Sequence, residues 1–345
     1  MRASVAIALA SALAVSAERR LSLEVNAPAS VLHVDNLSVK TTITNTGDET
    51  VKLLNDPRSP LSTWNTDTFS ITNGNGATPN FTGVKVRYIP EVAAKLTAPE
   101  TFTVLAPGQS VDVTHNLAGV YNFTAPGAGA YTFEPANLFS AVNADGSIST
   151  IYADTTTAES KISGKLAASV AAPTSSGHLG SRATYNSCSS TRQTQIASAI
   201  SSAQSYTTES LSALNASPSG TRYVTWFGTY TASRYNSVKS AFTNISGKPT
   251  GWKYDCTCTD SSTYAYVYPS QYGTVYLCGY FWNAPATGAG SRADTIIHEG
   301  THFPQILGTD DYAYGQSSCK SLAKSNPANA VYNADNYAFF STNAA

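Results

Sequence analysis

The sequence predicts two folded parts joined by a flexible segment: an all-β sandwich and, after it, an α+β domain. Three observations support this division. Short runs that alternate apolar and polar residues fill the first part, as in Leu21-Ser22-Leu23-Glu24-Val25. A stretch rich in Ala, Ser and Gly follows, from 164 to 183. The second part, 184–345, opens on a long run of polar and small residues with helical spacing.

The first part, 18–163, consists of predicted strands separated by turns. Runs such as 39–43 and 84–88 alternate apolar and polar residues, and Pro-Gly and Asn-Gly pairs lie between such runs. This pattern is typical of an immunoglobulin-like sandwich. Its two histidines, His33 and His115, are isolated in the sequence, so we expect structural or surface roles for them rather than metal binding.

The second part is predicted to mix helices with a small antiparallel sheet. Its roughly 160 residues are enough to bury one core. In chain order we expect helices at 191–214 and 232–244, strands at 265–268 and 274–278, a helix at 294–305 and a last helix at 314–325.

The N-terminus has the pattern of a signal peptide, residues 1–17. Arg2 precedes an apolar stretch from 3 to 15, and small residues end it at Ala17. The stretch is too short to span a bilayer, and no other apolar run reaches about 18 residues, so we expect a secreted, extracellular protein with no membrane partner. With 21 basic and 22 acidic residues and no basic cluster, the chain gives no reason to expect nucleic acid as a partner.

The segment Thr295-Ile296-Ile297-His298-Glu299-Gly300-Thr301-His302 contains an HExxH motif. On a helix, residues four apart differ by about 40° in rotation and about 6 Å in rise, so both imidazoles can bind one zinc ion. Glu299 then lies beside the metal. There it can take a proton from a zinc-bound water and pass it to a leaving amine, which is the chemistry of metal-assisted peptide hydrolysis.

A catalytic zinc needs a third protein ligand. The metzincin pattern is excluded, because Gln305 and Gly308 stand where it requires Gly and His. No glutamate or histidine occurs from 303 to 345, so a downstream ligand must be an aspartate. Asp310 and Asp311 are the local candidates, and Asp335 is the remaining one. Pro304 disfavours helical geometry at the preceding residue, so we expect the helix to bend or end there.

All five cysteines lie in the second part. In an exported protein they favour disulfides that stabilise this part and leave the first part without any. Cys256 and Cys258 are two apart in a strand-like segment, so their side chains point to one face and are poorly placed to bond each other. Five glycosylation sequons also fit secretion, at Asn36, Asn80, Asn122, Asn215 and Asn244.

At these residues the chain resembles the deuterolysin, or aspzincin, family of fungal zinc endopeptidases. That family combines HExxH with GTxDxxYG, which reads here Gly308-Thr309-Asp310-Asp311-Tyr312-Ala313-Tyr314-Gly315. Within the family the chain is most similar to the peptidyl-Lys metalloendopeptidases of basidiomycetes. The segments that carry this likeness are 184–188, 255–258, 273–279 and 333–336.

The resemblance implies a zincin-like catalytic domain, 184–345, with one zinc per chain held by His298, His302 and Asp311. It gives Tyr314 the role of donating a hydrogen bond to the oxyanion, beside the general base Glu299. It makes 18–163 a propeptide that assists folding and inhibits, with maturation within 164–183. It pairs Cys188 with Cys256 and Cys258 with Cys278, which leaves Cys319 as a buried thiol.

The resemblance also implies a pocket for a lysine after the scissile bond. Asp335 matches the main pocket carboxylate and Tyr264 an aromatic wall. Ala338 departs from the pattern, since close relatives carry a second acid there. We therefore expect cleavage on the amino side of lysine, with a weaker preference than in strict enzymes and some tolerance for arginine or other residues in the space left at position 338.

The leading hypothesis is thus a secreted, monomeric zinc endopeptidase that is made as an inactive precursor and acts on proteins or peptides. Two alternatives are proteolytic: a deuterolysin-like protease of broader specificity, and a metallopeptidase acting on small amides. A third is a cell-wall or carbohydrate-binding protein whose sandwich is the working part and whose protease domain has decayed.

Overall fold

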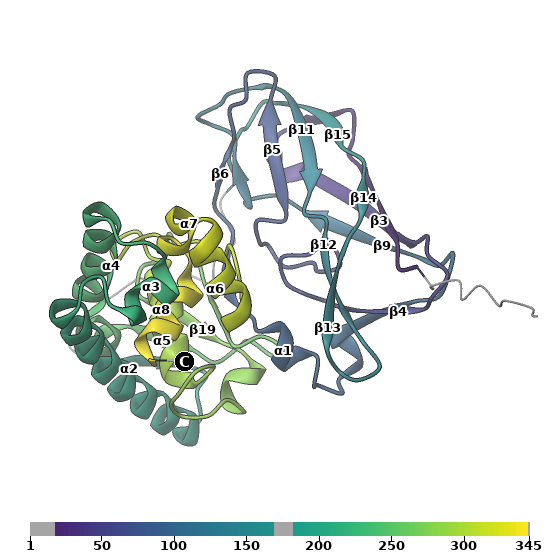
Figure 1. Cartoon of the computed structure of the whole chain (residues 1–345). Coiled ribbons are helices and arrows are strands. Elements are labelled where there is room, and N and C mark those ends of the chain that lie inside the picture. Colours follow the sequence, from purple (N-terminus) through teal and green to yellow (C-terminus); the bar gives the residue numbers. More distant parts are fainter. Residues whose placement is uncertain (1–17, 169–181, 344–345) are drawn as a thin grey trace, which may run out of the picture.

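The computed structural model describes residues 18–168 and 182–343. The predicted signal peptide, 1–17, and residues 169–181 of the predicted linker lie outside the described residues. Figure 1 shows two bodies side by side, a strand-rich N-terminal part (18–168) and a largely helical C-terminal part (182–343). The division into a strand-rich and a helical part is as predicted.

The N-terminal part contains most of the strands. Its strands are β1 (Leu21–Asn26), β2 (Ser30–Leu32), β3 (Ser38–Asn45), β4 (Val51–Leu54), β5 (Phe69–Asn73), β6 (Asn80–Phe81), β7 (Lys85–Arg87), β8 (Phe102–Leu105), β9 (Ser110–Asn116), β10 (Tyr121–Asn122), β11 (Gly129–Pro135), β12 (Leu138–Val142), β13 (Ile148–Tyr152), β14 (Asp154–Thr155) and β15 (Ala158–Ser163). Its short helices are α1 (Pro90–Ala93), η1 (Val34–Asn36) and η2 (Pro99–Thr101).

Three four-stranded sheets form its body, in the orders β14-β1-β3-β9, β2-β15-β11-β5 and β13-β12-β4-β8. The apolar face of β1 and β3 packs on that of β5, β11 and β15, with Val39, Ile71 and Phe133 in the shared core. A second core, which includes Ile43, Leu53 and Phe139, joins the first sheet to the third. His115 lies buried within this body, with its Nε2 3.0 Å from Thr41 Oγ1. This part therefore has its own hydrophobic interior.

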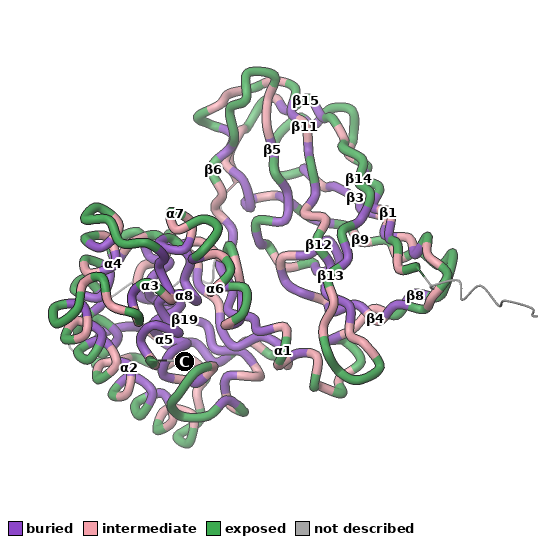
Figure 2. The backbone as a smooth tube through the Cα atoms, viewed as in Figure 1, coloured by how far each residue is buried: buried purple, intermediate pink, exposed green. Residues whose placement is uncertain are grey.

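The C-terminal part contains α2 (Ser190–Ala216), α3 (Thr221–Phe227), α4 (Ala232–Ile245), α5 (Arg292–Thr301), α6 (Gln316–Ser325), α7 (Pro327–Val331) and α8 (Ala334–Ser341). Its strands are β16 (Thr184–Asn186), β17 (Lys253–Asp255), β18 (Ala265–Val267) and β19 (Thr274–Leu277), with η3 (Lys248–Gly251) and η4 (Gly279–Trp282). Figure 2 shows α5 and α8 as buried elements inside this part.

The sheet of the C-terminal part is mixed, so the prediction of an antiparallel sheet was wrong. Its order is β16-β17-β19-β18-β7, and β16, β17 and β19 run parallel. β18 is antiparallel to β19, and β7 is antiparallel to β18. Parallel neighbours need a long crossover connection. Here the helices α2, α3 and α4 lie between β16 and β17 in the chain and supply it.

Strand β7 was assigned to the sandwich by the sequence pattern, and this was also wrong. It pairs with β18 and forms the edge of the other sheet, with Ala265 opposite Arg87 and Tyr266 opposite Val86. Alternation of apolar and polar residues identifies a strand but does not tell which sheet it joins. One strand of the N-terminal part therefore completes the C-terminal sheet.

The helices α2 and α4 agree with the predicted ranges within about two residues, whereas α3, α7 and α8 were not predicted. All eight residues of α8 are buried, so that helix has no polar face to reveal its period. The helix α5 ends at Thr301, with His302 as its cap, four residues earlier than predicted. Pro304 explains the early end, because it has no N–H to donate to Gly300.

Two disulfides stabilise this part, Cys188–Cys256 and Cys258–Cys278. Cys319 is buried on α6 and is the free thiol among the described cysteines. None of the described helices is long and apolar enough to cross a membrane.

Candidate active site

The helix α5 carries the HExxH motif into the middle of the C-terminal part. Ser291 caps its N-terminus, accepting a hydrogen bond from the N–H of Asp294 at 3.2 Å. The helix packs against α2 and α8, and every residue from Ala293 to Thr301 is buried. Gly300 is required by this packing, since a Cβ there would lie 2.5 Å from Ile245 Cδ1. The rest of the C-terminal part thus fixes the motif in place.

Three side-chain atoms converge at one point beside this helix. The Nε2 atoms of His298 and His302 are 3.2 Å apart, and Asp311 Oδ1 is 3.3 Å from the first and 3.4 Å from the second. A tetrahedral zinc with bonds of about 2.0–2.1 Å needs ligand atoms about 3.3 Å apart. Asp311 Oδ1, although buried, has no hydrogen-bond partner among the described residues. The three residues therefore fit a zinc ion.

The outer nitrogens of both imidazoles are held by hydrogen bonds. His298 Nδ1 lies 2.8 Å from Asp335 Oδ1, and His302 Nδ1 lies 2.9 Å from the carbonyl oxygen of Thr309. Both partners are acceptors, so each Nδ1 carries the proton and each Nε2 is left free to bind a metal. The Thr309 carbonyl is brought there by the turn at Gly308, which has a positive φ of 72°.

The electrostatics of the cluster favour a cation. Although burial alone would lower it, the pKa of His298 is raised to about 9 by the carboxylates of Asp311 and Asp335. Burial acts to raise the pKa of Asp311, but His302 and His298 hold it well below its usual range. An ionised carboxylate between two imidazoles is the environment that a divalent metal ion requires.

Glu299 lies fully buried next to this cluster. Neither of its carboxylate oxygens makes a hydrogen bond of ordinary geometry with a described residue. Burial raises its pKa to about 8, and the charges of His298 and Arg87 and the backbone N–H of Arg87 act in the opposite direction. A carboxyl group with a pKa near neutrality, and with no structural partner, can accept and return a proton.

Tyr314 is buried near the cluster, with its ring centre 6.4 Å from that of His298, and its hydroxyl donates a hydrogen bond to the carbonyl oxygen of Val86. Burial raises the pKa of this phenol well above its usual value, so it remains a donor. The guanidinium of Arg58 lies 3.7 Å from the centre of its ring. Tyr314 thus presents a hydroxyl donor that is already bonded to a peptide carbonyl.

The peptide in contact with these groups belongs to β7. The Val86 N–H donates to Asp311 Oδ2 at 3.2 Å, and its carbonyl accepts from Tyr314. The Arg87 side chain is fully buried, and its Nη2 lies 3.0 Å from Asp294 Oδ2. The N-terminal part therefore fills the candidate active site with the Val86–Arg87 peptide bond.

Two further cations of the N-terminal part bind the loop that carries the third ligand. Lys85 forms an ion pair with Asp310. Arg58 donates to the carbonyl oxygen of Asp311 at 3.1 Å. The two adjacent aspartates thus point to different partners, Asp311 to the histidines and Asp310 to Lys85.

The residues predicted to form the lysine pocket lie around the Arg87 guanidinium. The ring of Tyr264 is 5.5 Å from Arg87 Cζ. Asp335 Oδ1 is 3.8 Å from Arg87 Nε, while the same oxygen is bonded to His298 and Oδ2 accepts from Gly315 N–H at 2.9 Å. Sequence reasoning missed Asp294, because an acid three residues after Ser291 also fits an ordinary capping box. Arg87 was missed because it lies in the other part of the chain.

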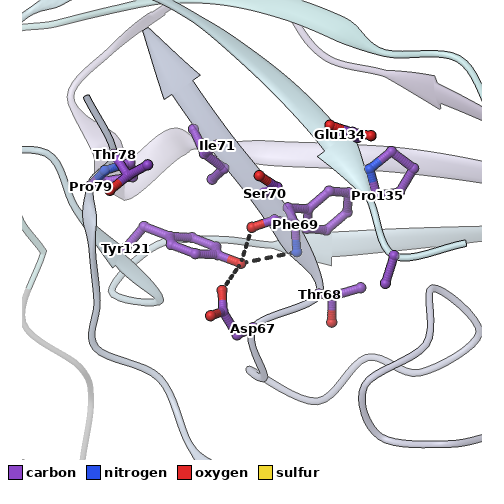
Figure 3. Close-up of a pocket in the computed structure, with 11 residues that line it drawn as sticks. Asp67, Thr68, Phe69, Ser70, Ile71, Thr78, Pro79, Tyr121, Glu134 and Pro135 are labelled. Atoms are coloured by element: carbon purple, nitrogen blue, oxygen red, sulfur yellow. Dashed lines mark hydrogen bonds between the residues drawn. The ribbon is translucent and has the colours of Figure 1, made fainter. Parts of the chain in front are cut away.

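A separate cavity of about 520 Å³ lies in the N-terminal part. Figure 3 shows Tyr121 at its wall, with the hydroxyl donating to Asp67 at 3.1 Å and accepting from the N–H of Phe69 at 3.1 Å. None of the site residues described above lines it. Burial raises the pKa of Asp67, whose partner in the cavity is already the tyrosine. This cavity is independent of the metal cluster.

Comparison with known proteins gives concordant matches. Residues 212–342 match the family model described as lysine-specific metallo-endopeptidase. The chain is 52% identical to a peptidyl-Lys metalloendopeptidase of Grifola frondosa, covering 99% of both chains. It is 52% identical to a protein of the same name from Armillaria mellea, covering 96% of this chain and 94% of the relative. An extracellular protease of Aeromonas hydrophila is 32% identical over 90% of this chain and 88% of its own.

Proposed function

This chain belongs to the lysine-specific metallo-endopeptidase family, also called the aspzincins, and from that premise we propose that it is a secreted zinc endopeptidase that cleaves proteins on the amino side of lysine. The observation that carries the proposal is the set of three converging ligand atoms, 3.2–3.4 Å apart, with the unpaired carboxyl group of Glu299 beside them. The comparisons support it, since relatives that align over nearly the whole chain are named for this activity.

His298, His302 and Asp311 would hold one zinc ion, which lowers the pKa of a bound water and polarises the substrate carbonyl. Glu299 accepts a proton from the attacking water while the oxygen of that water bonds to the carbonyl carbon of the substrate. Tyr314 donates a hydrogen bond to the oxyanion that forms. When the C–N bond breaks, Glu299 passes the proton to the leaving nitrogen, so that a carboxylic acid and an amine result, and the proton of the acid then passes to the amine to leave a carboxylate and an ammonium group.

The preference for lysine is supported by the names of the relatives and by the charge of the pocket. Asp294, Asp335 and the ring of Tyr264 surround the place where a cationic side chain is buried. A buried carboxylate stabilises a cation and disfavours an apolar side chain. A deuterolysin-like protease of broader specificity is the second candidate, because the site holds an arginine in this position.

The N-terminal part is proposed to be a propeptide that inhibits. Its Val86–Arg87 peptide occupies the cleft in the orientation of a substrate, so no other peptide can enter while it stays. A cavity of about 420 Å³ lies at this contact and includes Arg58 and Tyr314 in its lining, which suits a contact that must later be released. We place the signal peptide at 1–17 and maturation at 181–184, before a catalytic domain that works as a monomer. The extracellular Aeromonas relative supports secretion.

Zinc analysis and a protease assay on the secreted, processed protein test this function. We expect one zinc per chain, casein hydrolysis that a chelator stops, and fragments with N-terminal lysine. A well-folded processed protein without zinc or activity would refute the enzyme, and fragments with no basic residue at their N-termini would favour the broader protease. Sequencing the N-terminus of the same sample tests the maturation site, and a start inside 18–163 would contradict it.

A further inference from the structure

We infer that Asp294 is the carboxylate that directly binds the basic side chain after the scissile bond, and that through it the pocket accepts arginine as well as lysine. This inference deepens the proposed function and rests on it. The Asp294 position was assigned no role by the sequence, and the relatives' names do not mention arginine.

The register of β7 shows which side chain stands in for the substrate. The carbonyl of Val86 accepts from Tyr314, the donor for the oxyanion, so this carbonyl marks the scissile bond. The next residue, Arg87, is then the first one after that bond, and its backbone N–H acts on Glu299, which must protonate the leaving nitrogen. Antiparallel pairing of β7 with β18 holds the whole segment extended. The Arg87 side chain therefore lies where the specificity residue of a substrate would lie.

Asp294 makes the closer contact with this side chain. Its Oδ2 is 3.0 Å from Nη2 of Arg87, whereas the distance from Asp335 Oδ1 to Nε is 3.8 Å. Both carboxylates are fully buried, as is the guanidinium. Asp335 is also engaged at the metal cluster, since its Oδ1 accepts from the candidate ligand His298, and its Oδ2 accepts from the N–H of Gly315. Asp335 thus positions a metal ligand, and Asp294 binds the cation.

The Asp294 carboxylate is itself held in place for this contact. The N–H of Gly290 donates to Oδ2 at 2.7 Å, and the hydroxyl of Ser291 donates to Oδ1 at 3.3 Å. A capping role alone does not account for it, because capping carboxylates lie at solvent-exposed helix ends and need no cation, whereas this one is 0% exposed. A buried carboxylate of this kind needs a positive partner. In the processed enzyme the substrate has to supply that partner.

Because Asp294 and Asp335 both lie beside Arg87, the pocket has two carboxylates although position 338 is an alanine. Ala338 is buried and contributes only a methyl group, and Asp294 supplies the second carboxylate from α5. Two nitrogens of Arg87, Nε and Nη1, have no hydrogen-bond partner among the described residues. Tyr264 and Gly290 at the pocket wall also line a cavity of about 350 Å³. The pocket therefore accommodates a guanidinium, although two of its nitrogens are left without partners among the described residues, and the smaller ammonium of lysine fits as well.

The test uses the secreted, processed holoenzyme and a peptide series that differs only in the residue after the scissile bond: lysine, arginine, glutamine or leucine. The wild type should cleave the lysine and arginine peptides with kcat/KM values within about tenfold of each other and far above the other two. Asp294→Asn keeps the cap geometry and removes the charge. It should lower kcat/KM for both basic peptides by about 30-fold or more, leave the other two unchanged, and keep one zinc per chain. Ser189→Ala is the control, because it removes the equivalent N-terminal cap of α2 and leaves Asp294 and its partners intact, so the ratio between basic and neutral peptides should stay as in the wild type.

Adding Ala338→Glu to Asp294→Asn should restore part of the loss by returning a second carboxylate from α8. An unchanged preference for basic residues in Asp294→Asn would overturn the inference while leaving the proposed function intact. Rejection of the arginine peptide by the wild type would overturn the claim that the pocket accepts arginine. A wild type with no preference for basic residues would instead refute the proposed lysine specificity. If Asp294→Asn fails to fold, Asp294→Glu serves in its place, since it keeps the charge and shifts its position, and an unchanged ratio of lysine to arginine in that variant would contradict direct contact.

Discussion

The two parts of this molecule are stabilised in different ways. The C-terminal part is tied by two disulfides that link its sheet to neighbouring segments, and its central helices α5 and α8 are entirely buried. The N-terminal part has no cysteine and depends on the packing of its sheets. Yet it supplies the strand and the cations that occupy the site, Arg58, Lys85 and Arg87. The part that carries the candidate active site is stabilised by disulfides, and the part that we propose to block this site is held by packing and ion pairs.

The largest expected effect comes from replacing Glu299, the proposed general base in the C-terminal part. Glu299→Gln should lower turnover about 10³- to 10⁴-fold in the processed enzyme, because proton transfer to and from the water and the amine is lost. Zinc content should stay the same, since both histidines and Asp311 remain. Metal analysis together with peptide hydrolysis checks this, and the exposed Glu209→Gln on α2 is the control. An active Glu299→Gln enzyme would refute the assigned mechanism.

Substitutions of Asp310 and Asp311, which are adjacent in one loop, should affect different parts of the molecule. Asp311→Ala should weaken zinc binding by more than about 100-fold, because a ligand that is buried between both histidines is lost. Asp310→Ala should leave zinc bound and loosen the N-terminal part, because it removes the partner of Lys85. Competition with a chelator of known affinity measures the first effect. The reverse order would mean that the ligand assignment is off by one residue.

Acid should weaken the N-terminal part selectively. Burial lowers the pKa of His115 to about 4, against an unfolded value of 6.5. Because the unfolded state then binds the extra proton, stability is complete above pH 6.5 and is lost as the pH falls towards 4, by about 3 kcal/mol at 1.36 kcal/mol per pH unit. Hydrogen exchange in β3 and β9 of the precursor, measured against pH, checks this. His115→Gln should flatten the dependence, and a profile that stays as steep in that variant would exclude His115 as its source.

The smallest of these effects concerns the contact between the parts. Arg87→Ala in the unprocessed precursor should raise its activity on a short peptide by about 30-fold, corresponding to about 2 kcal/mol for truncating one partner of a buried charge pair. Arg87→Lys should keep the block, because an ammonium can still reach the carboxylates. Arg20→Ala, an exposed arginine of the same part, is the control. Equal activity of all four precursors would show that Arg87 does not hold the site closed.

The sequence was informative where the pattern is local. The spacing of His298 and His302 is set by a helix, so this pair could be identified before any tertiary contact was known. The spacing alone left Asp310, Asp311 and Asp335 open as the third ligand, and only the resemblance to the aspzincin motif selected Asp311 and Tyr314. The ranges of α2 and α4 were likewise visible in their periodicity. Pro304 correctly indicated that the metal helix would stop early.

The rest depends on contacts between distant segments, which periodicity does not report. Arg87 and Asp294 are 207 residues apart, and each one alone fits an ordinary role, on a strand or in a helix cap. The run at 84–88 has the alternation of a sandwich strand, but its partner is β18 of the other part. The helix α8 is buried on all sides, polar Asp335 and Asn336 included, so its sequence shows no amphipathic period that would identify it as a helix.

Without β7, β18 is the edge strand of the C-terminal sheet, and this limits which substrate peptides can bind in place of β7. Backbone groups of β18 pair with β7, and the side chain of Arg87 enters a closed pocket. A substrate that binds in the same way must therefore be extended over several residues. A lysine in a helix of a native protein does not meet that requirement. Folded proteins should therefore be digested at the rate at which they open locally, and the same proteins should be cut many times faster once denatured.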